Sequence, residues 1–426
     1  MRSSSSSLDQ PLTSGDYASE LRHRVNAFFP WLLVLIAMLA PLAMTAFVPA
    51  LPSIARDLYV TTEHAQLVLS VSLLATAIAS LGYGQIADKF GRRPALILGF
   101  GVAAIGSAMA TFGGTIDAVI VGRALQAVGA GSAYVLVRVL VSDVYRGNRA
   151  IAVLGYTSAA IAVAPIVGPL LGGVLSDAVG WRWIFASVGV LAILLMFACL
   201  LLLPETRERL DPAASPAPNE PRVRWFDLLT RTDYLRYLFV GAAVLAGLYA
   251  YVSGAPYLMI ENHGMSATTY GLYYVTTPFA YVVGSLAAGK LAAKLGRDSL
   301  CLLGIVGVVS FAFFAFVLSY AVGLTPLGLF GSMFGLALFA GICLPAAQAG
   351  LIEAAREKPG VASGIFTCIH MMLSAAIAQT VGVKLAQGIG PMSMTLPLLV
   401  MTSIGLLGYA FFGWRAQQSR QLAARD

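Results

Sequence analysis

Charge is the component that this sequence has least of. Charged residues make up 11% of its 426 residues, whereas soluble domains carry about 25%. Apolar residues make up 58% of the chain, and the mean hydropathy is +0.80. So few charges cannot cover the surface of soluble domains of this length. The composition therefore excludes a soluble protein and indicates an integral membrane protein.

Patterns for metal binding and catalysis are also scarce. The four cysteines all lie in apolar stretches and predict neither a disulfide framework nor a metal site. No His-Glu-x-x-His motif occurs, and no span holds a pair of catalytic carboxylates. Gly284–Leu291 imitates a P-loop but ends on Leu291, where Ser or Thr would be needed to bind the metal. We therefore expect no enzymatic activity, no catalytic residues, no cofactor, no metal and no bound nucleotide.

Long apolar stretches are what the sequence does contain. Each reaches the roughly 20 residues that a helix needs to cross the hydrocarbon core, and none alternates as barrel strands do. We predict an all-α integral membrane protein with twelve transmembrane helices. The predicted spans are 28–50, 65–86, 94–113, 115–142, 150–176, 182–203, 235–260, 269–289, 299–321, 325–351, 360–387 and 391–414.

The few basic residues are sorted by side of the membrane. Of the 27, 22 fall in the tails and in alternate loops, three fall on the opposite side and two, Arg123 and Arg138, lie inside a span. Because basic loops stay on the cytoplasmic side, both termini are expected to be cytoplasmic. A nucleic-acid surface is not indicated, since the charges are spread over separate segments.

A proline-rich, charged segment divides the twelve spans into two sets of six. It holds five prolines and predicts a polar, proline-rich cytoplasmic linker. Gly84–Arg93, after the second span, is repeated weakly in Gly289–Asp298, after the eighth. Two parallel six-helix bundles with pseudo-symmetry predict a transporter whose site lies between the halves. The predicted parts are a cytoplasmic tail 1–27, a bundle 28–203, a cytoplasmic linker 204–233, a bundle 234–414 and a cytoplasmic tail 415–426.

The segment Gly84–Arg93 resembles the loop 2–3 signature of the major facilitator superfamily at each defined position. Glycines allow a tight turn there, and the basic residues suit the anionic inner leaflet. The resemblance implies a conformational latch, and a topology anchor alone is the alternative. The second copy has Ala293 in place of the acid, which suggests a one-sided latch. The latch residues are Gly84, Asp88, Lys89, Gly91, Arg92 and Arg93.

Two further motifs lie inside spans. Arg123–Gly129 is similar to an arginine motif of the fourth helix in this family, and an arginine in mid-span is costly and by default functional. A structural ion pair or a snorkelling cation is its alternative. Ala164–Gly173 looks like the antiporter signature of the fifth helix, which the family associates with proton-exchanging exporters, although its glycines also suit close packing alone. The antiporter helix motif comprises Pro165, Gly168, Pro169, Gly172 and Gly173.

Three short segments, Phe47–Pro52, Gly180–Phe185 and Pro204–Thr206, resemble the Bcr/CflA (bicyclomycin/chloramphenicol resistance) subgroup of twelve-helix drug:proton antiporters. That subgroup has an acid late in the first helix, where this chain has Thr45. The proton-coupling candidates are therefore His370, which is the one histidine deep in a span, Glu261 at a membrane edge, and Arg123.

The family implies a substrate cavity lined by helices 1, 4, 7 and 10. We predict proton-coupled efflux of small amphipathic drugs by a monomer in a bacterial inner membrane. The alternatives are a dedicated exporter of a metabolite or siderophore, for which Arg123 and Arg138 would favour an anion, and a non-transporting receptor or enzyme. The predicted substrate-binding residues are Thr45, Phe47, Arg123, Gln126, Tyr134, Tyr249, Ser253, Tyr257 and Gln348; ordinary helix packing is the alternative for each.

Overall fold

Helices form every regular element in the part of the chain that the computed structural model describes, which is residues 29–423 without 146, 206–224, 322 and 356–358. The predicted tail 1–27 and most of the predicted linker lie outside these residues. The N-terminal half holds α2 (Phe29–Ala46), η1 (Val48–Ala50), α3 (Leu51–Asp57), α4 (Thr62–Phe90), α5 (Arg92–Phe112), α6 (Ile116–Val144), α7 (Gly147–Ala178) and α8 (Arg182–Leu202).

The C-terminal half follows the short helix α9 (Trp225–Leu228). It holds α10 (Thr232–Pro256), η3 (Tyr257–Asn262), α11 (Ala267–Tyr274), α12 (Thr276–Ala321), α13 (Pro326–Ala354), α14 (Pro359–Ala386) and α15 (Met392–Ala423). The last helix continues through the described part of the predicted tail 415–426.

The described residues contain eleven helical segments that are long and apolar enough to cross a membrane. One of them, Ala267–Ala321, has 55 residues and at 1.5 Å per residue would extend about 80 Å, more than twice a hydrocarbon core. Gly296 interrupts it with a φ of 73°, a conformation that favours glycine. This segment therefore makes two crossings, and the predicted twelve-helix fold is confirmed.

The first span differs from the predicted 28–50, because it is broken and extends to Asp57. The helix α2 ends at Ala46, and η1 and α3 follow Phe47. Pro49 and Pro52 near the starts of η1 and α3 lack the N–H groups that a continuous helix would use. The break in the first span therefore lies at the two prolines of this segment.

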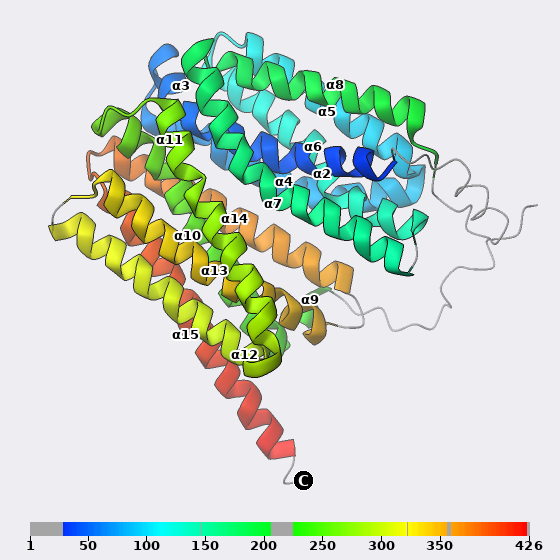
Figure 1. The fold of residues 1–426 in the computed structure, drawn as a ribbon, viewed down its shortest axis with the longest axis vertical. Coiled ribbons are helices and arrows are strands. Elements are labelled where there is room, and N and C mark those ends of the chain that lie inside the picture. The colour runs from blue at the N-terminus through cyan, green and yellow to red at the C-terminus, as the bar shows by residue number, and fades with distance from the viewer. Residues whose placement is uncertain (1–28, 146, 206–224, 322, 356–358, 424–426) are drawn as a thin grey trace, which may run out of the picture.

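The two halves contact one another mainly through α4 with α14 and through α7 with α11. Each half has its own apolar core, and a third buried cluster draws residues from both. Figure 1 shows the two bundles inclined to one another, closest at the end that holds α3 and α11. We call this end, where α3 ends and α11 begins, the distal end. The linker end is the opposite one, where α8 ends and α10 begins.

Candidate functional site

Asp177 joins the two halves at the distal end. It lies in the last turn of α7, and its carboxylate accepts hydrogen bonds from the backbone N–H groups of Ala267 (3.3 Å) and Thr268 (2.7 Å) and from the Thr268 hydroxyl (2.7 Å). Ser266 caps the next free amide of the same helix. A carboxylate is favourable at a helix N-terminus, so Asp177 of one half caps α11 of the other.

Glycines bring the same two helices into backbone contact. A Cβ built on Gly173 would lie 2.3 Å from the carbonyl oxygen of Ala267, and one on Gly271 would lie 2.6 Å from that of Pro169. A second contact at this end joins α4 to α14, where Ser70 donates a hydrogen bond to Gln379 (3.2 Å). The hydrogen bonds that join the halves through described residues thus lie at the distal end.

An apolar cluster seals the distal end beneath these polar contacts. Phe47, Trp181 and Phe185 of the N-terminal half pack there with Tyr257 and Met371 of the other half, all less than one-tenth exposed. Because large apolar side chains from both halves exclude water, the structure is closed at this end.

The antiporter helix motif packs on two neighbours at once. Its Gly168 lies against Thr45 of α2, since a Cβ there would be 2.3 Å from the Thr45 hydroxyl oxygen. A Cβ built on Gly172 would lie 1.7 Å from the Ala46 carbonyl oxygen. Gly173 faces α11 of the other half. Pro165 and Pro169 lie inside α7. The motif therefore holds the first helix within its own half and also contributes to the distal contact.

Arg123 is completely buried on α6 beside the break in the first helix. Its guanidinium carbon lies 4.2 Å from the centroid of the Phe47 ring, and Nη1 donates to Oε1 of Gln126. Nε2 of Gln126 in turn donates to the Ser107 hydroxyl (2.7 Å). The structure thus brings together three predicted site residues, and it adds Ser107, which no sequence motif indicated.

The other predicted substrate-binding residues fall into two groups. Thr45, Tyr134 and Tyr249 are partly exposed and Gln348 is exposed, whereas Ser253 and Tyr257 are buried. Arg138, exposed, lies over the Tyr134 ring at 5.5 Å.

The two proton-coupling candidates on the C-terminal half lie in different surroundings. His370 is 7% exposed; its Nδ1 lies 3.1 Å from the Phe366 carbonyl oxygen, and its ring stacks on that of Phe366. When Nδ1 carries the proton and donates this bond, Nε2 is the acceptor of the neutral ring. Glu261 is exposed in η3 at the distal end.

The loop 2–3 residues meet the start of the linker. Oε1 and Oε2 of Glu205 accept from the backbone N–H groups of Arg92 (2.9 Å) and Arg93 (3.3 Å), so Glu205 caps α5. Gly91, with a φ of 103°, makes the turn. Arg92 also pairs with Asp143 of α6 (3.2 Å). The segment Pro204–Thr206 was selected only for its resemblance to the subgroup, and its Glu205 proves to be a hydrogen-bond partner of loop 2–3.

Gly84 does not form the turn that the sequence predicted for it. It lies inside α4, which continues to Phe90, and nothing lies within 4 Å of a Cβ built there. Lys89, in the last turn of α4, lies over the Phe90 ring. Asp88 is in the same turn, and the structure describes its backbone alone.

The second copy of this loop keeps an equivalent ion pair despite Ala293. Arg297 follows the turn at Gly296 and pairs with Glu353 in the last turn of α13, as Arg92 pairs with Asp143. Asp298 accepts from Arg236 (3.2 Å) and from Tyr237. Burial alone would raise the pKa of this loop carboxyl, but the Tyr237 hydrogen bond and the guanidinium groups of Arg236 and Arg297 outweigh it and lower the pKa.

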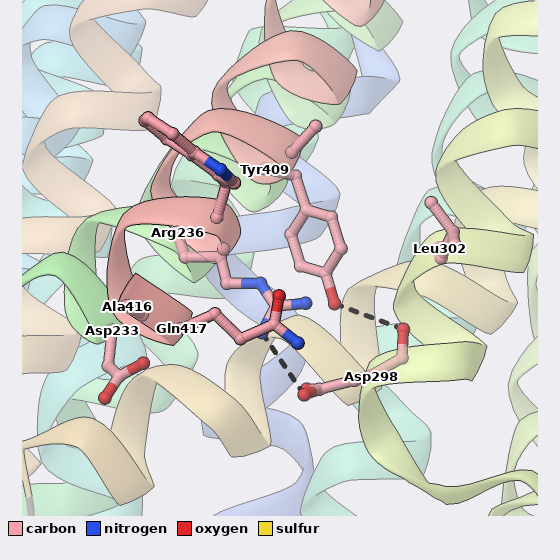
Figure 2. A pocket seen from close by; sticks show the side chains of 10 residues that line it. Asp233, Arg236, Asp298, Leu302, Tyr409, Ala416 and Gln417 are labelled. Atoms are coloured by element: carbon pink, nitrogen blue, oxygen red, sulfur yellow. Dashed lines mark hydrogen bonds and ion pairs between the residues drawn. The ribbon is translucent and has the colours of Figure 1, made fainter. Parts of the chain in front are cut away.

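A surface pocket of about 390 Å³ adjoins this second cluster. Figure 2 shows two contacts of Asp298 there: Arg236 reaches its carboxylate, and Tyr409 donates to its carbonyl oxygen (3.1 Å). The pocket lies at the linker end, outside the interface between the halves, and it is no part of the predicted substrate path.

Comparison with known proteins agrees with the fold and the motifs. The model of the Major Facilitator Superfamily matches residues 33–379. The chain is 28% identical to a chloramphenicol resistance protein of Pseudomonas aeruginosa, over 80% of each chain. It is 26% identical to multidrug resistance protein D of Escherichia coli, over 91% of this chain and 95% of that one.

A solved structure is similar over nearly the whole chain. A bacterial homologue of the human lysosomal transporter Spinster, solved in an inward-facing and occupied conformation, superposes with a TM-score of 0.72 at 16% sequence identity. The match covers 92% of this chain and 97% of that one. With the fold and the family model in agreement, the chain belongs to the Major Facilitator Superfamily and is a multi-pass membrane transporter, not an enzyme.

Proposed function

We propose that this transporter exports small amphipathic compounds, drugs among them, by alternating access coupled to protons moving the opposite way. The observation that carries the proposal is the position of the antiporter helix motif. Its glycines pack on the first helix, and Gly173 packs on α11 of the other half. Because the motif contacts both helices, a movement of the first helix could be transmitted through α7 to the contact that closes the distal end.

The two relatives support drugs as substrates, since one is a chloramphenicol resistance protein and the other a multidrug resistance protein. Tyr134, Tyr249 and Gln348, which are accessible to different degrees, are proposed to line the substrate path. Aromatic surfaces with few fixed polar groups suit varied amphipathic solutes.

The charge distribution supports a cytoplasmic linker end, with both termini on that side. The bacterial relatives support a location in the inner membrane. In that orientation the distal closure separates the site from the outside, so the described conformation would receive substrate from the cytoplasm. His370 is the proposed proton carrier, because it is buried in a span and imidazole is the side chain that in its unperturbed form changes charge near physiological pH.

Transport in proteoliposomes tests this proposal. Inside-out vesicles loaded with protons should accumulate chloramphenicol while the pH gradient lasts, and nigericin should abolish accumulation. His370→Gln should lose gradient-driven accumulation and keep downhill flux, whereas the exposed His64→Gln should retain both. Accumulation that survives nigericin would contradict antiport, and the absence of flux for every compound in a drug panel would contradict export.

A further inference from the structure

The guanidinium group of Arg123 is held in one orientation by contacts on two of its sides. Nη1 donates to Gln126, whose amide is fixed by its own bond to Ser107, and the Ser107 hydroxyl donates to the Ala103 carbonyl oxygen (2.7 Å). The guanidinium carbon lies over the Phe47 ring, 4.2 Å from its centroid. These contacts involve Nη1 and the carbon of the guanidinium group, and they leave the edge formed by Nε and Nη2 without a hydrogen bond to the described residues.

That edge has no acceptor among the residues that the structure describes. Both Nε and Nη2 of Arg123 are buried, and neither makes a hydrogen bond to the described protein. The two N–H groups on this edge point the same way, which is the geometry that binds a carboxylate through two parallel bonds. An ionised group buried without a partner is strongly unfavourable, so the edge favours an anionic ligand.

The described side chains near Arg123 do not supply the opposite charge. Thr45, at the position where the family resemblance implies an acid, donates its hydroxyl to the Pro41 carbonyl oxygen (2.9 Å) and lies against Gly168. On α6 itself, the acids Asp117 and Asp143 lie close to its two ends. An external anion is therefore the partner that this site lacks.

The Phe47 ring that covers Arg123 lies next to a segment that contacts the other half. Phe47 lies at the break between α2 and η1, and η1 contacts α10 and α11 of the other half. Broken membrane helices provide ligand sites in transporters of this architecture. Separation of the halves at the distal end would move η1, and with it the ring that covers the guanidinium group.

We propose that the Nε–Nη2 edge of Arg123 binds a single anionic group, either a carboxylate on the transported compound or a free chloride ion. The carboxylate source rests on the proposed export function, whereas the chloride source does not. Binding there completes the hydrogen bonding of the buried guanidinium group and is expected to stabilise the surrounding helices.

Ligand binding to purified protein in detergent tests the site without requiring transport. One arm replaces sodium methanesulfonate, whose anion has no carboxylate, by sodium chloride at constant ionic strength and follows the unfolding temperature. The other compares the affinities of 1-pyrenebutyrate and its methyl ester. A saturable rise with chloride identifies the free ion, and at least tenfold tighter binding of the carboxylate than of the ester identifies a substrate group.

Three variants assign the effect to the proposed edge. Arg123→Gln should abolish the anion effect, and Arg123→Lys, which keeps the charge but not the two-pronged edge, should weaken it. Arg182→Gln should retain it, since Arg182 stacks on Trp181 at the same 4.2 Å but lies at the distal end. Should Arg123→Gln fail to fold, Arg123→Lys alone decides.

A folded Arg123 variant with the wild-type anion preference, or a wild type with no preference in either arm, would overturn the inference. The proposed function can fail separately: an anion effect without flux of any compound contradicts export alone, and flux without an anion effect contradicts the anion site alone.

Discussion

At the residue scale, Gly91 meets two separate requirements of the turn between α4 and α5. Its φ and ψ of 103° and 159° lie in a region that is essentially restricted to glycine. A Cβ there would also lie 2.4 Å from Oε2 of Glu205, so any side chain would displace the carboxylate that caps α5. Gly84, in the same signature, meets neither requirement.

Gly91→Ala is therefore expected to destabilise the loop and to impair transport. Backbone strain of this kind costs about 1–3 kcal/mol, and loss of the helix cap adds to it. The unfolding temperature in detergent and the initial rate of efflux both measure the effect. Gly84→Ala is the matched control and should lower neither, because alanine is favoured over glycine inside a helix and nothing lies near a Cβ there; equal losses from the two substitutions would refute this explanation of the signature.

At the element scale, α7 lies between two partners and presents different glycines to each. Gly172 contacts the backbone of α2 within the same half, and Gly173 contacts the backbone of α11 in the other half. Adjacent positions on one helix thus serve two different contacts, one inside a rigid bundle and one at an interface that must separate during transport.

Alanine at these two positions should have different consequences. Gly172→Ala overlaps the Ala46 carbonyl oxygen, and overpacking of this kind costs about 1–3 kcal/mol, so the unfolding temperature should fall. Gly173→Ala should instead favour separation of the halves with little loss of stability, seen as faster labelling of a cysteine placed at Tyr257. Gly155→Ala on the same helix, where nothing lies within 4 Å, is the control. A reversed pattern would contradict the assignment of the two glycines.

Much of the element arrangement could be predicted from the sequence, because a membrane span needs a long apolar run and these runs are distinct. The latch was predicted less well. The signature suggested a turn at both glycines, but α4 continues through Gly84, since apolar length alone does not mark where a helix ends. Glu205 was noticed only as part of a family segment, and no motif indicated Asp177. Their partners are backbone amides far along the chain, which no local pattern reveals.

At the scale of the whole molecule, the distal end is closed by a small number of polar contacts above an apolar cluster. Hydrogen bonds to a charged group contribute about 1.5–3 kcal/mol each, and Asp177 accepts three. Since about 1.4 kcal/mol changes an equilibrium tenfold, this one carboxylate has a large influence on whether the halves meet.

Asp177→Ala is therefore expected to shift the protein at least tenfold towards a state open at the distal end. Spin labels at Tyr59 and Leu327, which are 96% and 82% exposed, report the distance between the halves at that end, and the population with the longer distance should increase. Asp117→Ala, which removes an exposed acid within the N-terminal half, should leave the distance distribution unchanged. An unchanged distribution in Asp177→Ala would show that the apolar cluster closes this end by itself.

The cap that Glu205 places on α5 has a consequence for the evolution of the loop. Glu205 binds the backbone N–H groups of residues 92 and 93, so this contact tolerates any side chain at either position except proline, which has no N–H group. Mutational drift at these two sites can therefore alter the ion pair with Asp143 and the affinity for lipid while the cap persists. The contact between Glu205 and the loop that joins α4 to α5 can therefore persist in evolution while the basic side chains of that loop change.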